Sequence, residues 1–160
     1  MKTLPVLLLL AVLCIPKMSM ACSCIYMGKF IEYASNRDGV VRAKVKSYGP
    51  RLSHGKTLYE SMVVEIMEVV KGKYAQEELT FLGDPGNLCR GYVDSLKFKI
   101  GSEHFFSLTN KNVTQPLGGC GESSLPIKGD LIEGNELVGN TYKPYTMRVI
   151  DLIKSLKAKK

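Results

Sequence analysis

Apolar and charged side chains alternate with a period of two in several parts of the chain. Val41, Ala43 and Val45 alternate with charged residues, which predicts a strand with one apolar and one charged face. Four other segments with alternating or β-branched residues are also predicted to be strands: residues 62–70, 79–81, 96–100 and 105–108. Because five strands are enough for a small barrel, we expect a mainly β protein with a closed five-stranded barrel.

Two segments have a helical pattern, one at residues 28–34 and a clearer one at 145–157. In the second segment, apolar residues recur at i, i+3, i+4 and i+7: Val149, Leu152, Ile153 and Leu156. This stripe is expected to pack against the barrel as a flanking helix. Clusters of Gly, Pro, Asp and Asn at 83–87 and 118–121 predict loops between the strands.

The first 21 residues resemble a secretory signal peptide. Lys2 precedes an apolar run from Leu4 to Ile15, and cleavage is favoured after Ala21. The apolar run is shorter than the roughly 20 residues that a membrane span needs. We therefore expect a protein with no membrane span, secreted to the extracellular space or the extracellular matrix, where conditions are oxidising.

Composition is ordinary for a chain with one hydrophobic core, with 45% apolar and 23% charged residues. It excludes intrinsic disorder, collagen and a multi-span membrane protein. The formal net charge of +7 permits contact with acidic polymers, although we expect no nucleic acid partner. A basic carboxyl-terminal end is either a solvated tail or a site for sulfated glycans: Lys154, Lys157, Lys159 and Lys160.

The cysteines predict a disulfide framework. Four remain once the signal peptide with Cys14 is removed: Cys22, Cys24, Cys89 and Cys120. An even number in a secreted chain predicts two disulfides, for which three pairings are possible. A bridge between the first two would close a strained small ring, so each is expected to pair with one of the other two. A Cys-x-Cys zinc site is the alternative, but neither His54 nor His104 lies at ligand spacing from a cysteine.

No known catalytic motif is found in the chain, so we expect a protein that is not an enzyme and has no cofactor of its own. His54 and His104 are interpreted as ordinary structural residues. One modification signal is present, because Asn112-Val113-Thr114 is an N-glycosylation sequon on a predicted loop.

The predicted mature chain resembles the amino-terminal, netrin-like domain of the tissue inhibitors of metalloproteinases. It would begin with Cys22-Ser23-Cys24, followed by the segments 40–45 (Val-Val-Arg-Ala-Lys-Val) and 70–72 (Val-Lys-Gly), and by Cys89 and Cys120. The resemblance covers about residues 22–125. The chain is similar to a short form, because residues 122–160 contain no cysteine, whereas vertebrate members carry a cysteine-rich carboxyl-terminal domain.

This resemblance implies an OB-type barrel with the disulfides Cys22–Cys89 and Cys24–Cys120. It implies that the amine and carbonyl of Cys22 chelate the catalytic zinc ion of a secreted metalloprotease, and that Ser23 points into the primary specificity pocket. Neighbouring residues of the same inhibitory edge are implied to contact the protease: Cys24, Ile25, Asn87, Leu88 and Cys89.

Three regions are therefore expected: a signal peptide at 1–21, a netrin-like inhibitor barrel at 22–125, and an extension at 126–160 with an amphipathic helix and a basic tail. The alternative is a netrin-like extracellular binding or matrix module that inhibits nothing, since fold does not imply function.

Overall fold

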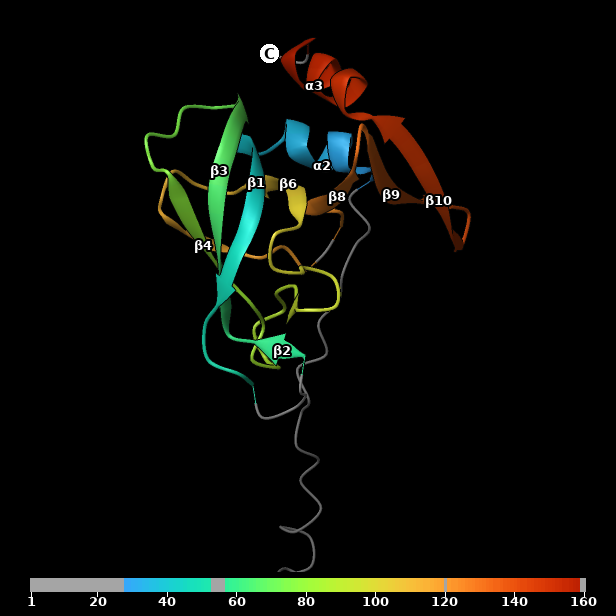
Figure 1. Cartoon of the computed structure of the whole chain (residues 1–160). Helices are drawn as coiled ribbons and strands as arrows, with labels where there is room; N and C mark the ends of the chain where they lie inside the picture. Colours follow the sequence, from blue (N-terminus) through green and yellow to red (C-terminus); the bar gives the residue numbers. More distant parts are fainter. Residues whose placement is uncertain (1–27, 53–56, 120, 159–160) are drawn as a thin grey trace, which may run out of the picture.

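The computed structural model describes residues 28–52, 57–119 and 121–158 (Figure 1). Within these ranges the protein is mainly β, with two short helices, α2 (Phe30–Ser35) and α3 (Val149–Ala158). The strands are β1 (Gly39–Tyr48), β2 (Leu58–Tyr59), β3 (Ser61–Lys71), β4 (Glu78–Leu82), β5 (Val93–Asp94), β6 (Glu103–Leu108), β7 (Thr114–Pro116), β8 (Ser124–Lys128), β9 (Leu131–Val138) and β10 (Thr141–Arg148).

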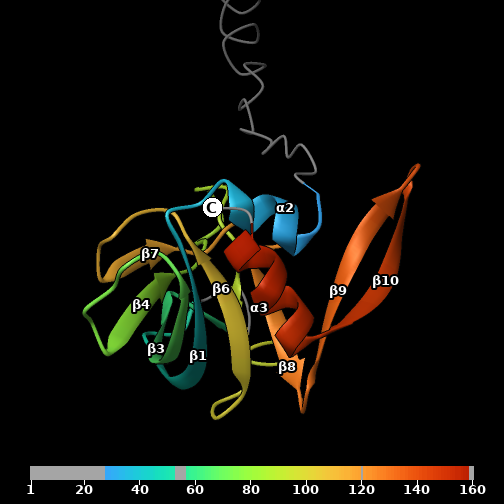
Figure 2. The same ribbon diagram turned by 90° about the horizontal axis from the view of Figure 1, so that it is seen from above.

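Eight of these strands form one mixed sheet, in the order β10-β9-β8-β6-β1-β3-β4-β7. Strands β4 and β7 pair in parallel, whereas the other neighbouring pairs are antiparallel. The β9–β10 hairpin extends away from the rest of the sheet (Figures 1 and 2). Strands β2 and β5 form a separate two-stranded sheet.

The expected closed five-stranded barrel is not found among the described residues. The large sheet is open there, with β7 and β10 at its two edges. One of the five strands counted from the sequence does not form, and β7 to β10 extend the sheet instead of closing it. The prediction of a mainly β protein with flanking helices is confirmed, and that of a closed barrel is wrong.

Alternation in β1 places apolar side chains on two faces of the sheet. Val41, Ala43 and Val45 are buried on one face, as the pattern predicted, together with residues such as Phe81 and Phe106. Val40 faces the other way and belongs to a second apolar cluster. That cluster contains residues of both helices and of the sheet: Phe30, Ala34, Val40, Val70, Phe105, Leu125, Ile132, Leu152 and Leu156.

The predicted helical stripe packs as expected, because Leu152 and Leu156 are buried in the second cluster while Val149 and Ile153 are partly buried against it. Figure 2 shows α3 lying over β6 and β8 with α2 beside it. The expected start of this helix at residue 145 is wrong. Residues 141–148 pair with β9 as strand β10, and the helix begins only at Val149.

The strand predicted at residues 96–100 is also wrong. Asp94 accepts backbone hydrogen bonds from Lys97 at 3.1 Å and Phe98 at 2.8 Å, and its carboxylate accepts the N–H of Leu96 at 2.8 Å. These local bonds turn the chain where a strand would need bonds to a neighbour. Phe98 remains buried, but Leu96 and Ile100 are 69% and 63% exposed.

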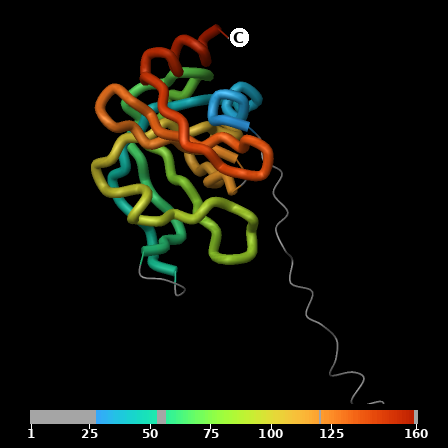
Figure 3. The backbone as a smooth tube through the Cα atoms, turned by 90° about the vertical axis from the view of Figure 1, so that its right-hand side faces the viewer, coloured from blue at the N-terminus to red at the C-terminus, as the bar shows by residue number. Residues whose placement is uncertain are grey.

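Helix α3 and the loops that connect β4 to β6 lie at opposite ends of the molecule. Figures 1 and 3 show α3 at one end and the connections between β4 and β6 at the other.

Strand β8 begins at Ser124 and pairs with β6, so residues on both sides of position 125 contribute to the same sheet.

Candidate functional site

The loop that precedes Cys89 is built around the carboxylate of Asp84. One oxygen, Oδ1, accepts backbone N–H groups of three residues: Gly86 at 2.6 Å, Asn87 at 2.8 Å and Leu88 at 3.0 Å. The other oxygen, Oδ2, accepts the N–H of Arg90 at 2.9 Å. Charged hydrogen bonds of this kind are roughly twice as strong as neutral ones, so a single buried side chain holds residues 84–90 in one conformation.

The same bonds keep Asp84 ionised. The N–H of Leu88 makes the largest contribution to lowering the pKa of this carboxyl to about 2, and the other three N–H groups act in the same direction while burial opposes them. A carboxylate that accepts several backbone N–H groups is stabilised in its charged form. The Asp84 carboxylate that holds the loop is therefore fully charged at neutral pH.

Three residues assigned to the inhibitory edge lie on the outer side of this loop. Asn87, Leu88 and Cys89 are all exposed, and the large apolar side chain of Leu88 is 49% exposed. Cys89 has a φ of 54°, which is uncommon for a residue other than glycine, and it is disulfide-bonded. The structure thus presents an apolar side chain and a fixed cysteine next to each other at the surface.

The other predicted edge residues, Cys22, Ser23, Cys24 and Ile25, lie outside the described residues, as does Cys120. The pairings Cys22–Cys89 and Cys24–Cys120 therefore stay predictions, as does the contact of Cys22 with a target's zinc ion.

The segment leading to Cys120 lies directly against the loop. Gly91 donates its N–H to the carbonyl of Leu117 at 2.9 Å, and Arg90 forms an isolated bridge with Gly118. A Cβ atom placed on Gly119 would lie 2.4 Å from the carbonyl oxygen of Cys89, which leaves no room for a side chain there. The structure therefore brings Cys89 beside the residue that precedes Cys120.

On the far side of position 120, Glu122 connects this region to α2 and the β9–β10 hairpin. Its carboxylate accepts the N–H of Phe30 at 3.1 Å, the hydroxyl of Tyr145 at 2.8 Å and the N–H of Asn135. Neither Asp84 nor Glu122 was identified as functional from the sequence. The role of Asp84 could have been predicted from the Asp-Pro-Gly-Asn sequence at 84–87. An Asp at the start of a turn can accept hydrogen bonds from the backbone N–H groups that follow it.

The sequon lies on an exposed bend between β6 and β7. Asn112 donates its N–H to Oδ1 of Asn110 at 2.9 Å, and its carbonyl accepts from Nε2 of Gln115 at 2.6 Å. Both Asn112 and Thr114 are exposed, so the sequon is accessible in the folded protein. Lys154 and Lys157 of the predicted basic tail are exposed on α3, while positions 159 and 160 lie outside the described residues.

In the described part of the chain, no group of three or more metal-ligating side chains could hold an ion. The helices described there include none with the length and apolar character of a membrane span.

No protein family model matches the chain, and a search of curated proteins finds no relative.

Proposed function

We propose that this protein is a secreted inhibitor of zinc metalloproteases that acts through the amino terminus of its mature form. A zinc protease keeps one coordination position open for the attacking water. The amine and carbonyl of Cys22 would occupy that position and displace the water. An α-amino group has a pKa of about 8, so a neutral, metal-binding form is available near physiological pH.

The observation that carries this proposal is the exposed, disulfide-bonded Cys89 on the loop that Asp84 holds in place. An edge fixed before binding loses less conformational entropy on association than a flexible one. Under the proposed pairings, Cys22 would be tied to Cys89, and Cys24 would be tied to the position after Gly119. Both bridges would then anchor the amino terminus to the region that the Asp84 loop and residues 117–119 build together.

The remaining roles follow from this placement. Ser23 enters the primary specificity pocket, where a small hydroxyl suits many proteases. Asn87 and Leu88 fill neighbouring subsites beside the chelating residue, and Ile25 continues the contact beyond Cys24. The protein has no cofactor of its own and contacts the zinc ion of its target.

The test compares three forms of the protein on a panel of secreted zinc endopeptidases: the form beginning at Cys22, a form with one Ala added before it, and Ser23→Gly. The added Ala converts the donor amine into an amide, which is a poor metal ligand, so inhibition should be lost. Ser23→Gly keeps the chelate and should change which proteases are inhibited. Circular dichroism confirms that all three forms are folded.

An Ala-extended protein that inhibits as strongly as the processed one would exclude the chelation mechanism. If the processed form inhibits no member of the panel, the better description is a netrin-like extracellular binding or matrix module. In that case the exposed Lys154 and Lys157 make sulfated glycans the first partners to test.

A further inference from the structure

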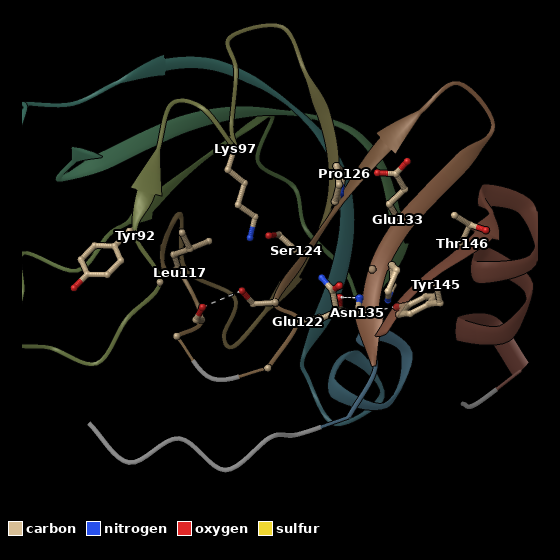
Figure 4. Close-up of a pocket in the computed structure, with 17 residues that line it drawn as sticks. Tyr92, Lys97, Leu117, Glu122, Ser124, Pro126, Glu133, Asn135, Tyr145 and Thr146 are labelled. Atoms are coloured by element: carbon tan, nitrogen blue, oxygen red, sulfur yellow. Dashed lines mark hydrogen bonds between the residues drawn. The ribbon is translucent and has the colours of Figure 1, made fainter. Parts of the chain in front are cut away.

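A cavity of about 660 Å³ lies between the β9–β10 hairpin and the chain segments around residues 91–97, 117–119 and 121–124 (Figure 4). Its volume is within the range of pockets that hold small ligands or single side chains of a partner. The apolar and aromatic part of the cavity wall is formed by Leu117, Pro126 and Tyr145. The polar groups in the wall include those of Lys97 and Ser124.

Lys97 directs its ammonium group into this cavity (Figure 4). Among the described residues, no carboxylate oxygen lies within 4.0 Å of its Nζ atom to form an ion pair. The Nζ atom lies 5.0 Å from the centre of the Phe98 ring. Although Lys97 is exposed at the rim, partial burial of the ammonium lowers its pKa, and the more distant Glu122 and Asp94 only partly compensate. Among the described residues, the Lys97 ammonium thus faces the cavity with no carboxylate in direct contact.

Ser124 supplies the second unusual group. The residue is 6% exposed, and within the described part of the chain its Oγ atom has no hydrogen-bond partner. A buried hydroxyl left without a partner destabilises the fold, and such groups are rare enough in native proteins to need an explanation. Figure 4 shows this hydroxyl pointing toward the same space as the Lys97 ammonium.

The acidic residues of the cavity are already engaged. Glu122 accepts three hydrogen bonds, as described above, and Glu133 is paired with Lys128 at 2.6 Å. Their negative charge opposes the entry of any anion, and it opposes a doubly charged phosphate or sulfate more strongly than a singly charged carboxylate. One ammonium and one hydroxyl match the two oxygens of a singly charged carboxylate.

We propose that this cavity binds a carboxylate group, with the Lys97 ammonium as its counter-ion and the Ser124 hydroxyl as its hydrogen-bond donor. The apolar wall formed by Leu117 and Tyr145 receives the carbon chain that carries the carboxylate. The carboxylate belongs either to an acidic side chain of a partner protein or to a small free acid. This binding does not depend on the proposed inhibition of metalloproteases.

The test is a titration followed by NMR on uniformly ¹⁵N-labelled mature protein. Three probes are compared: acetyl-Ala-Glu-Ala-amide, the matching Gln peptide, and acetate. The Glu peptide should shift the amide signals of Gly118, Ser124 and Gly134 in a saturable way, and the Gln peptide should bind at least tenfold more weakly. Acetate binding as tightly as the Glu peptide assigns the site to small acids, while a clearly tighter peptide assigns it to a protein partner.

Variants separate the site from general charge effects. Lys97→Met should weaken binding of the Glu peptide at least tenfold, and Ser124→Ala about threefold. Lys99→Met, which removes a nearby exposed lysine outside the cavity, should leave binding unchanged. Ser124→Ala removes an unpartnered hydroxyl and should fold normally, so it keeps the test valid if Lys97→Met does not fold. Equal binding of the Glu and Gln peptides, or unchanged binding in the Lys97 and Ser124 variants, overturns the proposal.

Discussion

The ammonium of Lys71 donates a hydrogen bond to the carbonyl of Ser35 at 2.7 Å, which joins the end of β3 to the end of helix α2. The same ammonium also donates to the carbonyls of Arg37 at 2.8 Å and Ala34 at 3.1 Å. A lysine at this position satisfies carbonyls that the helix leaves free and complements the helix dipole. The Val-Lys-Gly run at 70–72 thus has a defined structural role.

Replacing Lys71 with Met should lower the free energy of unfolding by about 1–3 kcal/mol, because three partly buried carbonyls lose a charged donor. Urea unfolding followed by circular dichroism measures the change. Lys73→Met, at an exposed position two residues later, should change stability by less than about 0.5 kcal/mol. Equal effects of the two substitutions would show that the contacts of Lys71 do not stabilise the fold.

Asp84→Ala should disorder the loop that carries Leu88 and Cys89, since four backbone N–H groups lose their acceptor together. We expect the free energy of unfolding to fall by at least about 2 kcal/mol. Under the proposed function, inhibition of zinc proteases should weaken as well. Hydrogen exchange at residues 86–90 measures the local effect directly. Asp94→Ala removes a carboxylate that accepts the backbone N–H of Leu96. This control should have a smaller effect than Asp84→Ala. Unchanged exchange in Asp84→Ala would contradict the assigned role.

His104 makes stability depend on pH. The ring is 1% exposed, and its Nε2 atom lies 2.9 Å from Oγ of Ser102, whose hydrogen is donated to the carbonyl of Lys99 at 2.6 Å. Nε2 therefore carries the proton, and Nδ1 is an unprotonated atom without a partner. Burial, with a smaller contribution from the charge of Lys97, lowers the pKa of His104 to about 4.

Because the pKa of an unfolded histidine is about 6.5, the unfolded chain binds the proton more tightly. The stabilising effect of the neutral ring is complete above pH 6.5 and is lost as the pH falls toward 4, by at most about 1.4 kcal/mol per pH unit. Urea unfolding between pH 7 and pH 5 should show this slope. His104→Phe should flatten it, whereas His54→Gln should retain it. A slope that disappears in His54→Gln instead would assign the effect to the other histidine.

The disulfide framework can be tested by peptide mapping without reduction. We expect Cys22–Cys89 and Cys24–Cys120 and no free thiol in the secreted protein. Two such bridges, each closing a long loop, would stabilise the fold by roughly 4 kcal/mol each on the chain-entropy model. A Cys22–Cys120 bridge or a quantitative free thiol would contradict this assignment.

Secretory expression should attach a glycan to Asn112, because the sequon lies on an exposed bend. Digestion with an N-glycosidase should then increase the electrophoretic mobility of the wild-type protein. Asn112→Gln and Thr114→Ala should both migrate as the digested form. A wild-type protein whose mobility does not change on digestion would show that the sequon is not used.

Period-two patterns predicted the centre of the sheet well. In β1 the alternating residues Val41, Ala43 and Val45 are all buried, as the pattern predicted. In β3 Met62, Val64 and Val70 are buried, whereas Met67 is 53% exposed. The segment at 96–100 has the same pattern, yet hydrogen bonds to Asp94 turn the chain there. The alternation of apolar and polar residues does not show which nearby acceptor will form a hydrogen bond with a backbone N–H group.

Boundaries and long-range contacts were less predictable. The predicted helix began at Tyr145, but pairing with β9 makes residues 145–148 part of a strand. The contact between Cys89 and Gly119 joins residues 30 positions apart in the sequence, and only the folded sheet brings them together. Conversely, the exposed position of Asn87 agrees with the loop predicted at 83–87, and Leu88 and Cys89 continue the exposed segment.

Among the described residues, the large sheet ends in β7 and β10, and both of these edge strands contain a proline. Pro144 lies within β10 opposite Asn135, and Pro116 ends the short β7 opposite Leu82. Proline has no backbone N–H, so neither edge offers an unbroken row of donors to the strand of another molecule. The exposed Lys143 lies next to Pro144. Its positive charge would repel the same lysine on the β10 edge of a second copy. These two edge strands are thereby protected against edge-to-edge self-association.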